Sequence, residues 1–503
     1  MGGIEEMKLI TTVVTVIYMA ICLGIGIYSK KRAEAGGKEF FASYKQFGWL
    51  LAGLAAAAAG MSAYGYVGGP GLAYKSGAAV WYMPWFFVLS YGMMTWLNGK
   101  PMRMMAEIAR IETFPDLAHE RYQCKWTRFF LSLNLVFCIW AYLGTQVLGG
   151  GLILQWLTGL DAGIAGVLIL LVTIIYTYYG GMVGSILVDG LQGFLMILSI
   201  VGAFIGCIMI IGSFDNFVTT VGSSSLGPHY VDPVGFPTEA MLPLVFSWIF
   251  VLAFGVVGQP HVNTKFYALK SYEDLRFKGF IGGVGYGIAG FMYMLPAIAV
   301  LYLVAIGQVQ PLKIADQAVF VFAEHIPMWV TVVIIMGLLA ALMSTASSFL
   351  VIGSALFTRD IPKAFGKELS QKDEVRIGRI ALLILGLGAC IFGLFGGYMV
   401  ALLGVLGLGT FVACSLPVVI GYLWRRATKE AALVAQILVL LCSFGISVGY
   451  EKLLGLKLPG GIPGYVFYIC LSFLVMIFVS LVTKGSAGDR LPEKMKIYFR
   501  HLE

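Results

Sequence analysis

Long apolar stretches constrain this chain more than any other feature of its sequence. They recur along all 503 residues, each close to the roughly 20 residues that a helix needs to cross a bilayer. Only 12% of the residues are charged, about half the share typical of soluble proteins. The sequence therefore predicts an all-α polytopic membrane protein with about 13 transmembrane helices. The expected spans lie near residues 8–28, 46–72, 77–98, 128–157, 163–180, 184–213, 241–262, 279–307, 328–357, 378–398, 400–424, 430–452 and 464–483.

Basic residues indicate how these spans are oriented. If the spans alternate, all but five of the 34 Lys and Arg residues fall on one side, which the positive-inside rule makes cytoplasmic. The five exceptions are Lys8, Lys75, Lys313, Lys452 and Lys457. The basic run at 30–32 follows the first span, which argues against a cleaved signal peptide. We expect the N-terminus outside and the C-terminus in the cytoplasm. The net charge of +8 follows this topology and is no sign of nucleic-acid binding.

The expected ninth span carries hydroxyl side chains where Leu and Val are usual. On a helix, Ala341, Ser344, Thr345 and Ser348 share one face, with Ser347 beside them. A stripe of neutral oxygens suits a monovalent cation that has lost its water. Such hydroxyls also bond to carbonyls of their own helix and allow helices to pack closely. This stretch alone leaves both interpretations open.

Two spans are interrupted by Gly and Pro. The second contains the run 60–70, GMSAYGYVGGP, and the seventh contains the run 254–261, FGVVGQPH. Freed backbone groups are tolerated in lipid only where they line a cavity. Because the interruptions are five spans apart, the second copy enters the membrane from the opposite side. A single break could be a simple proline kink, but a pair in corresponding positions indicates an inverted-repeat transporter with its site at the midplane.

One carboxylate, Asp189, falls within the sixth span. An Asp at a helix centre costs about 3 kcal/mol on insertion scales, so we expect it to face the bundle or a cavity. It could neutralise a cation near the hydroxyl stripe. It could also be an interfacial residue held by water and by its own helix.

Three motifs together resemble the sodium/solute symporter family. They are Gly180-Gly181 with Asp189 and Gln192, the run 258–261 (GQPH) and the run 339–345 (LAALMST). The resemblance extends from the first span to about residue 425. It implies a leucine-transporter-like 5+5 inverted repeat with broken helices. The repeats would be 46–213 and 241–425, joined by an external loop at 214–240. Residues 1–45 would form a peripheral span and a basic loop, and 426–503 two additional spans and a basic tail.

The resemblance also implies ion ligands. One sodium ion would lie between the second and ninth spans, held by the carbonyls of Ala58, Met61 and Ala341 and the hydroxyls of Ser344 and Thr345. Some family members hold a second sodium ion nearer the cytoplasm. That pattern is matched here by Ser344, Ser347, Ser348 and Asp189, so the sequence leaves open one or two ions.

The solute is less constrained. Proline-type members have an Asp where this chain has Gly60, and aromatic residues where it has Leu252 and Val256. The runs 68–77 and 145–150 are closest to the pantothenate and monocarboxylate members. We expect a pocket lined by Tyr64, Gly65, Tyr66, Trp140, Gln146, Phe254 and Gln259. Ordinary packing explains each of these aromatic residues equally well.

These observations predict a sodium-coupled symporter that imports a small organic solute by alternating access. The solute that they favour is a monocarboxylate or a pantothenate-like acid. Sodium would be the coupling ion, with no further cofactor, in a plasma membrane of the bacterial inner-membrane type. The alternatives are proton coupling through Asp189, an amino-acid or sugar substrate, a sensor with this fold, or a channel. The sequence shows no constellation typical of an enzyme, and it does not reveal the oligomeric state.

Overall fold

The computed structural model describes residues 2–34, 40–41, 47–233, 241–271, 273–395, 400–447, 455, 458, 462–484 and 491–501. These residues form helices and no β-strand, which confirms the all-α class. The α-helices are α1 (Gly2–Tyr28), α2 (Lys30–Ala33), α4 (Trp49–Gly60), α5 (Gly69–Ser76), α6 (Met83–Met94), α7 (Lys100–Ile108), α8 (Phe114–Tyr122), α9 (Lys125–Thr158), α10 (Ala162–Ile211), α11 (Phe214–Ser223), α12 (Met241–Phe254), α13 (Pro260–Asn263), α14 (Asp274–Gly290), α15 (Leu295–Ala305), α16 (Ala318–Glu324), α17 (Met328–Ala355), α18 (Ile361–Ala364), α19 (Gln371–Phe395), α20 (Val400–Leu423), α21 (Lys429–Cys442), α22 (Gly464–Val482) and α23 (Glu493–Arg500).

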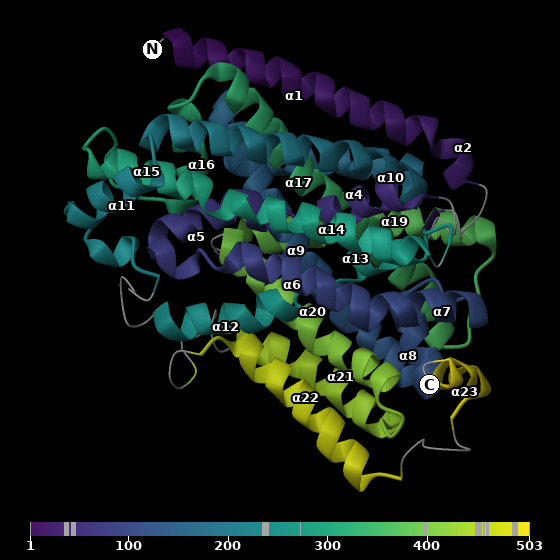
Figure 1. Ribbon diagram of the computed structural model, residues 1–503. Coiled ribbons are helices and arrows are strands. Elements are labelled where there is room, and N and C mark those ends of the chain that lie inside the picture. Colours follow the sequence, from purple (N-terminus) through teal and green to yellow (C-terminus); the bar gives the residue numbers. More distant parts are fainter. Residues whose placement is uncertain are drawn as a thin grey trace.

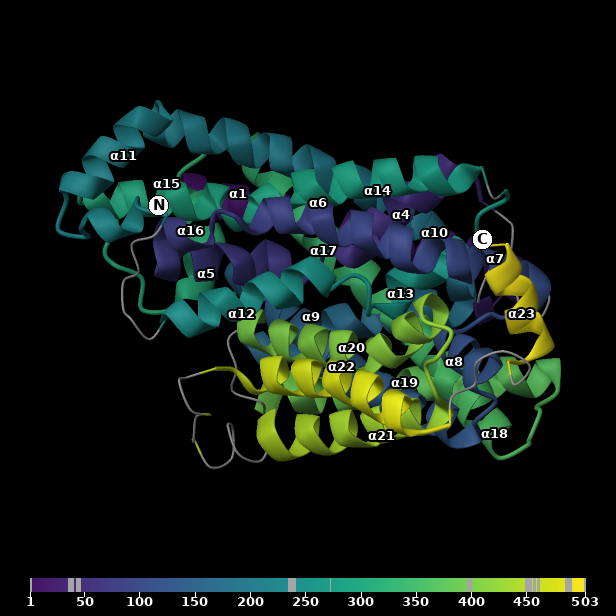
Figure 2. The same ribbon diagram turned by 60° about the horizontal axis from the view of Figure 1, so that its bottom comes forward.

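The long helices run side by side in one bundle, with α4, α9 and α17 near its middle (Figure 1). Helix α1 lies along one face, and α21 and α22 lie together on the opposite one. The two chain ends lie at opposite ends of the bundle in both views (Figures 1 and 2). This placement fits an odd number of crossings.

Among the described residues, nine helices are long and apolar enough to cross a membrane. Counting the bent pair Trp49–Gly60 and Tyr64–Val80 as one span gives ten. Within the described residues, every predicted span falls on a helix or on a broken pair of helices; positions 46, 396–398 and 448–452 of these spans lie outside them. The exact count of thirteen stays a prediction.

Helix α10 is two predicted spans joined by a sharp bend at Gly181. Its φ of 51° and ψ of −150° are open to glycine and strained for other residues. The Trp156 indole, six residues before α10 begins, donates a hydrogen bond to Glu324 over 2.7 Å. Gly206, near the other end of α10, packs against Ile326. Both ends therefore lie at the same end of the bundle, and the chain reverses at the bend.

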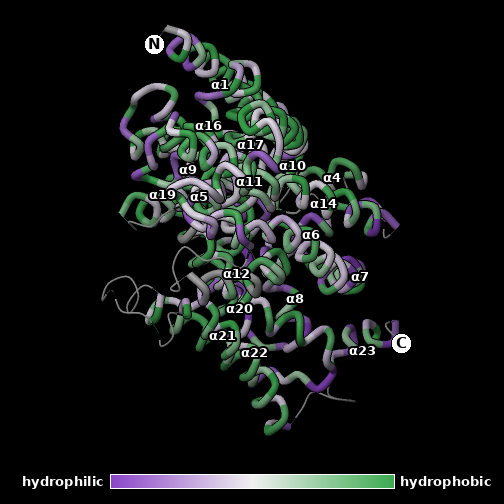
Figure 3. The backbone as a smooth tube through the Cα atoms, turned by 60° about the vertical axis from the view of Figure 1, so that its left-hand side comes forward, coloured by the Kyte–Doolittle hydropathy of each residue, from purple (hydrophilic) through white to green (hydrophobic). Residues whose placement is uncertain are grey.

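The outer surface is apolar, as lipid contact requires. Large hydrophobic side chains such as Val16 on α1, Phe204 on α10 and Phe478 on α22 are exposed. Figure 3 shows hydrophobic residues dominating the long helices, with hydrophilic ones gathered around α7 and α23. The protein is an integral membrane protein.

Two lysines that the predicted spans place in a loop are not exposed. The side chains of Lys265 and Lys278 are both fully buried. Lys278 lies over the ring of Phe266, 3.5 Å from its centroid. Lys265 lies at the candidate site.

Candidate functional site

The break in the second predicted span leaves carbonyl groups without their helical donors. Helix α4 ends at Gly60, and Met61 is extended, with φ −95° and ψ 135°. The last four carbonyls of a helix have no intrahelical partner, and they carry the negative end of its dipole. Gly60 is required by close packing, because a Cβ there would lie 2.8 Å from a ring carbon of Tyr286. This explains why no larger residue occupies that position.

Helix α17 turns two hydroxyls toward this break. The Ser344 hydroxyl lies 2.9 Å from the Ala58 carbonyl and 3.1 Å from that of Ala341. The Thr345 hydroxyl lies 2.7 Å from the Met61 carbonyl and 3.0 Å from that of Ala341. The structure thus brings together, in a fully buried cluster, all five oxygens expected around the first ion.

This cluster has more acceptors than donors. Thr345 also lies 3.0 Å from the Ala59 carbonyl, so four carbonyls surround two hydroxyls. Each hydroxyl has one proton and donates one strong hydrogen bond. His261 meets part of this excess at the Ala59 carbonyl, and the remaining acceptor oxygens are what a cation without its water would satisfy.

The second break is stabilised differently. Helix α12 ends at Phe254 and α13 begins at Pro260. Asn98 donates to the Val257 carbonyl over 2.7 Å, and Asn263 donates to the Gln259 carbonyl over 2.7 Å. These amides therefore partner the carbonyls of Val257 and Gln259, which the break frees.

His261 joins the two breaks. Its Nε2 lies 2.9 Å from the carbonyl of Ala59, the same carbonyl that Thr345 approaches. Its ring packs on Phe349 with centroids 3.8 Å apart, and Phe349 stacks on Phe411. The start of α13 therefore contacts the end of α4 directly.

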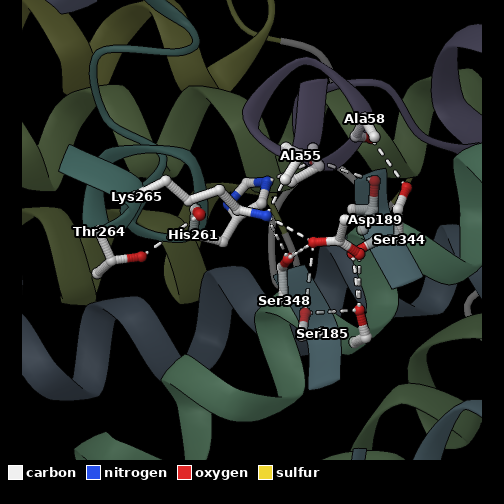
Figure 4. A network of polar contacts seen from close by, with 12 residues as sticks. Ala55, Ala58, Ser185, Asp189, His261, Thr264, Lys265, Ser344 and Ser348 are labelled. Carbon is white, nitrogen blue, oxygen red and sulfur yellow. Dashed lines mark hydrogen bonds and ion pairs between the residues drawn. The ribbon is translucent and has the colours of Figure 1, made fainter. Parts of the chain in front are cut away.

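Asp189 is fully buried, as expected, and lies among serines (Figure 4). Ser348 donates to its Oδ2 over 3.1 Å, Ser347 to its Oδ1 over 3.3 Å, and Ser185 to its Oδ2 over 3.3 Å. Its shortest contact is one that the sequence did not predict: the ammonium of Lys265 lies 2.5 Å from Oδ2.

Lys265 belongs to the segment that follows the second break, four residues after His261. The predicted span ends at residue 262, so the sequence predicts that Lys265 lies in the loop that follows. A basic residue one helical turn beyond a broken, apolar span could have indicated a buried ion pair, because the break itself indicates a cavity. Its pairing with a carboxylate 76 residues away in sequence was not visible.

The structure places the expected pocket residues in several separate environments. Tyr64 and Gly65 meet at Tyr293, whose ring centroid lies 5.6 Å from that of Tyr64. Gln146 accepts a hydrogen bond from the Ala63 amide over 3.0 Å, so it holds the break itself. Trp140 packs against Gly388 of α19.

The remaining expected residues are Tyr66, Phe254 and Gln259. Phe254 is half-buried at the end of α12, and Tyr66 is fully buried. Gln259 is fully buried too, and neither end of its carboxamide has a hydrogen-bond partner among the described residues. The hydroxyls of Tyr64 and Tyr293 interact with each other and have no further partner among the described residues. Tyr293 was not predicted, because nothing in its local sequence distinguishes it from a packing residue.

A large cavity and a small void lie apart from these pocket residues. A cavity of about 900 Å³ opens between α6, α7, α14 and α23, and no predicted residue lines it. A small void of about 10 Å³ lies beside Ala57 and Ala58 at the first break. The breaks are therefore closely packed in this conformation.

Comparison with known proteins identifies the family. Residues 40–438 match the Sodium:solute symporter family. The chain belongs to this family. As a family member it resembles the sodium/pantothenate symporter of Escherichia coli (strain K12), with 26% identity over 84% of this chain and 87% of the relative. It also resembles the sodium/proline symporter of Staphylococcus aureus (strain JH9), with 25% identity over 75% of this chain and 74% of that one.

A solved structure gives the same fold. A Na⁺-coupled sialic acid symporter, in a substrate-bound outward-open state with a novel Na⁺ site, superimposes with a TM-score of 0.78. The match covers 95% of this chain and 98% of the other at 18% identity. The predicted leucine-transporter-like architecture is thereby confirmed, and this symporter-family chain is a transporter rather than an enzyme.

Proposed function

We propose that the chain imports a small organic acid, of the monocarboxylate or pantothenate class, together with sodium by alternating access. Sodium-coupled solute symport itself follows from the family and from its sodium-coupled relatives. Each charge that enters gains about 2.3 kcal/mol per 100 mV of membrane potential. One or two ions thus supply useful concentrating power.

The observation that carries the proposal is the oxygen cluster at the first break. Ala58, Met61, Ala341, Ser344 and Thr345 supply hard, neutral oxygen ligands, three of them backbone carbonyls. The end of α4 adds the negative end of a helix dipole. In broken-helix transporters, unwound carbonyls and half-helix ends bind the coupling ion.

The solute class is supported by neutral polar groups rather than by charge. The buried Gln259 carboxamide has no partner among the described residues, and the Tyr64 and Tyr293 hydroxyls interact with each other nearby. Hydroxyl and amide donors of this kind suit a carboxylate with hydroxyl or amide groups. The pantothenate symporter of E. coli covers more of this chain than the proline symporter of S. aureus does.

Uptake of radiolabelled solutes into proteoliposomes tests the proposal. Pantothenate, lactate, pyruvate, acetate, proline and a sugar are compared with and without an inward sodium gradient at fixed pH. We expect sodium-dependent uptake of one of the acids. If no solute showed sodium-dependent uptake while one showed proton-dependent uptake, sodium coupling would be refuted. Uptake restricted to proline or the sugar would refute the acid assignment.

We also place the protein in a bacterial plasma membrane, with its N-terminus outside and its C-terminus in the cytoplasm. The asymmetry of the basic residues supports this orientation. The placement of the chain ends at opposite ends of the bundle agrees with it. Labelling of a single cysteine added before α1, in intact cells, would test it.

A further inference from the structure

The Asp189 cluster lies one helical turn from the first cluster. Helix α4 contributes the Ala58 carbonyl to the first cluster and the Ala55 carbonyl to the second, about 4.5 Å apart along the helix. Helix α17 repeats the pattern, with Ser344 at the first cluster and Ser348 at the second. The two clusters therefore lie along the same pair of helices.

The second cluster is filled by a side chain. The Lys265 ammonium lies 2.5 Å from Asp189 Oδ2, 3.0 Å from the Ala55 carbonyl and 3.2 Å from the Ser348 hydroxyl (Figure 4). An ammonium has three protons to donate, and here three oxygens accept them. One carboxylate, one backbone carbonyl and one hydroxyl are also donor types that bind sodium.

Charge makes the two occupants exclusive. Asp189 supplies one negative charge, and the ammonium of Lys265 balances it in a site with no exposure to solvent. A sodium ion placed beside the ammonium would put two like charges within a few ångströms at low dielectric. Without the lysine, a buried carboxylate would be left unpaired, which favours capture of a cation.

We propose that Lys265 is a tethered cation that replaces a second coupling ion, so that this symporter moves one sodium ion per solute. The proposal rests on the proposed function and deepens it by fixing the ion stoichiometry. It also predicts that removing the lysine turns the Asp189 cluster into a sodium site.

Sodium binding to the purified protein tests this without depending on transport. Binding of ²²Na⁺ is counted per protein molecule in detergent, in parallel with sodium-dependent thermal stabilisation. We expect one ion for the wild type and for Lys265→Arg, which keeps the positive charge. For Lys265→Ala we expect two ions. For Lys265→Ala combined with Asp189→Asn we expect one, because the carboxylate is gone.

Lys278→Ala is the matched control. This lysine is equally buried but packs on the rings of Phe266 and Tyr91, and it makes no ion pair among the described residues. Its removal should leave one ion bound. The double variant Lys265→Ala with Asp189→Asn is neutral at both positions of the pair. It keeps the test valid if Lys265→Ala alone does not fold. A folded double variant that bound two ions would contradict the proposal.

The outcomes distinguish a failure of the tethered-cation proposal from a failure of sodium-coupled symport. Two ions on the wild type, or one on folded Lys265→Ala, would overturn the tethered-cation proposal while leaving sodium symport intact. No sodium bound to the wild type, together with sodium-independent uptake, would overturn both. In liposomes, the ratio of ²²Na⁺ to solute entering should be one for the wild type.

Discussion

Replacing Thr345 by Val tests the first cluster most directly. The substitution keeps the shape of the side chain and removes its hydroxyl, which lies within 3.0 Å of the carbonyls of Ala59, Met61 and Ala341. A hydrogen bond to a charged group is worth about 1.5–3 kcal/mol, and we take a hydroxyl ligand of sodium to be similar. The sodium-free protein also loses a bond of about 1 kcal/mol, which reduces the difference.

The expected net loss of sodium affinity is therefore about 0.5–2 kcal/mol, or about 2- to 30-fold. The assay is the sodium concentration that gives half-maximal solute uptake, with sodium-dependent thermal stabilisation as a second readout. Solute affinity at saturating sodium should change little, because the hydroxyl faces the ion cluster. Thr345→Ser keeps the hydroxyl and should stay close to the wild type.

A second control lies on the same helix. The Ser354 hydroxyl is buried and donates to the Val351 carbonyl over 2.7 Å, within α17 itself. Ser354→Ala should not change the sodium dependence. If Thr345→Val folds and its sodium dependence stays within twofold of the wild type, the first cluster is not the coupling site.

Two further predictions concern stability. Gly60→Ala should lower the free energy of unfolding by about 1–3 kcal/mol, because the new methyl would lie 2.8 Å from the Tyr286 ring. A melting curve would measure this loss, and adding Tyr286→Leu should restore part of it. Asp316, in the loop between α15 and α16, is buried, and loss of hydration raises its carboxyl pKa to about 6. The folded protein therefore loses stability as pH rises from about 4 through 6, and Asp316→Asn should remove a cost of about 3 kcal/mol at pH 7.5 and much less at pH 4.5. Equal effects of Asp316→Asn at both pH values would contradict this reasoning.

The sequence predicted the parts of the site that depend on local pattern. The hydroxyl stripe at Ser344 and Thr345 and the break after Gly60 were both visible, because helical spacing and Gly-Pro interruptions are properties of a short window. Their meeting in space followed from the family resemblance. Gln146 was expected in the solute pocket, but its hydrogen bond to the Ala63 amide depends on how α9 packs against the break.

Lys265 shows what local pattern does not reveal. Hydropathy places a lysine beyond the end of a span, and only the tertiary structure shows that a carboxylate from α10 and a serine from α17 neutralise and bind it. The same holds for the amides of Asn98 and Asn263, which partner the carbonyls of the second break. Long-range pairs of this kind compensate polar groups that would otherwise be excluded from a membrane.

The contact of His261 with the Ala59 carbonyl has a consequence for energy coupling. Ala59 belongs to the first break and His261 to the second, and Thr345 approaches the same carbonyl oxygen. An ion that withdraws the Thr345 hydroxyl from that oxygen changes the partner that His261 depends on. Thermodynamic linkage makes such coupling reciprocal. If ion binding favours one arrangement of α13, a solute that favours the same arrangement also favours ion binding. Any coupling between sodium and solute that passes through this shared oxygen atom would change the affinity for each by an equal factor.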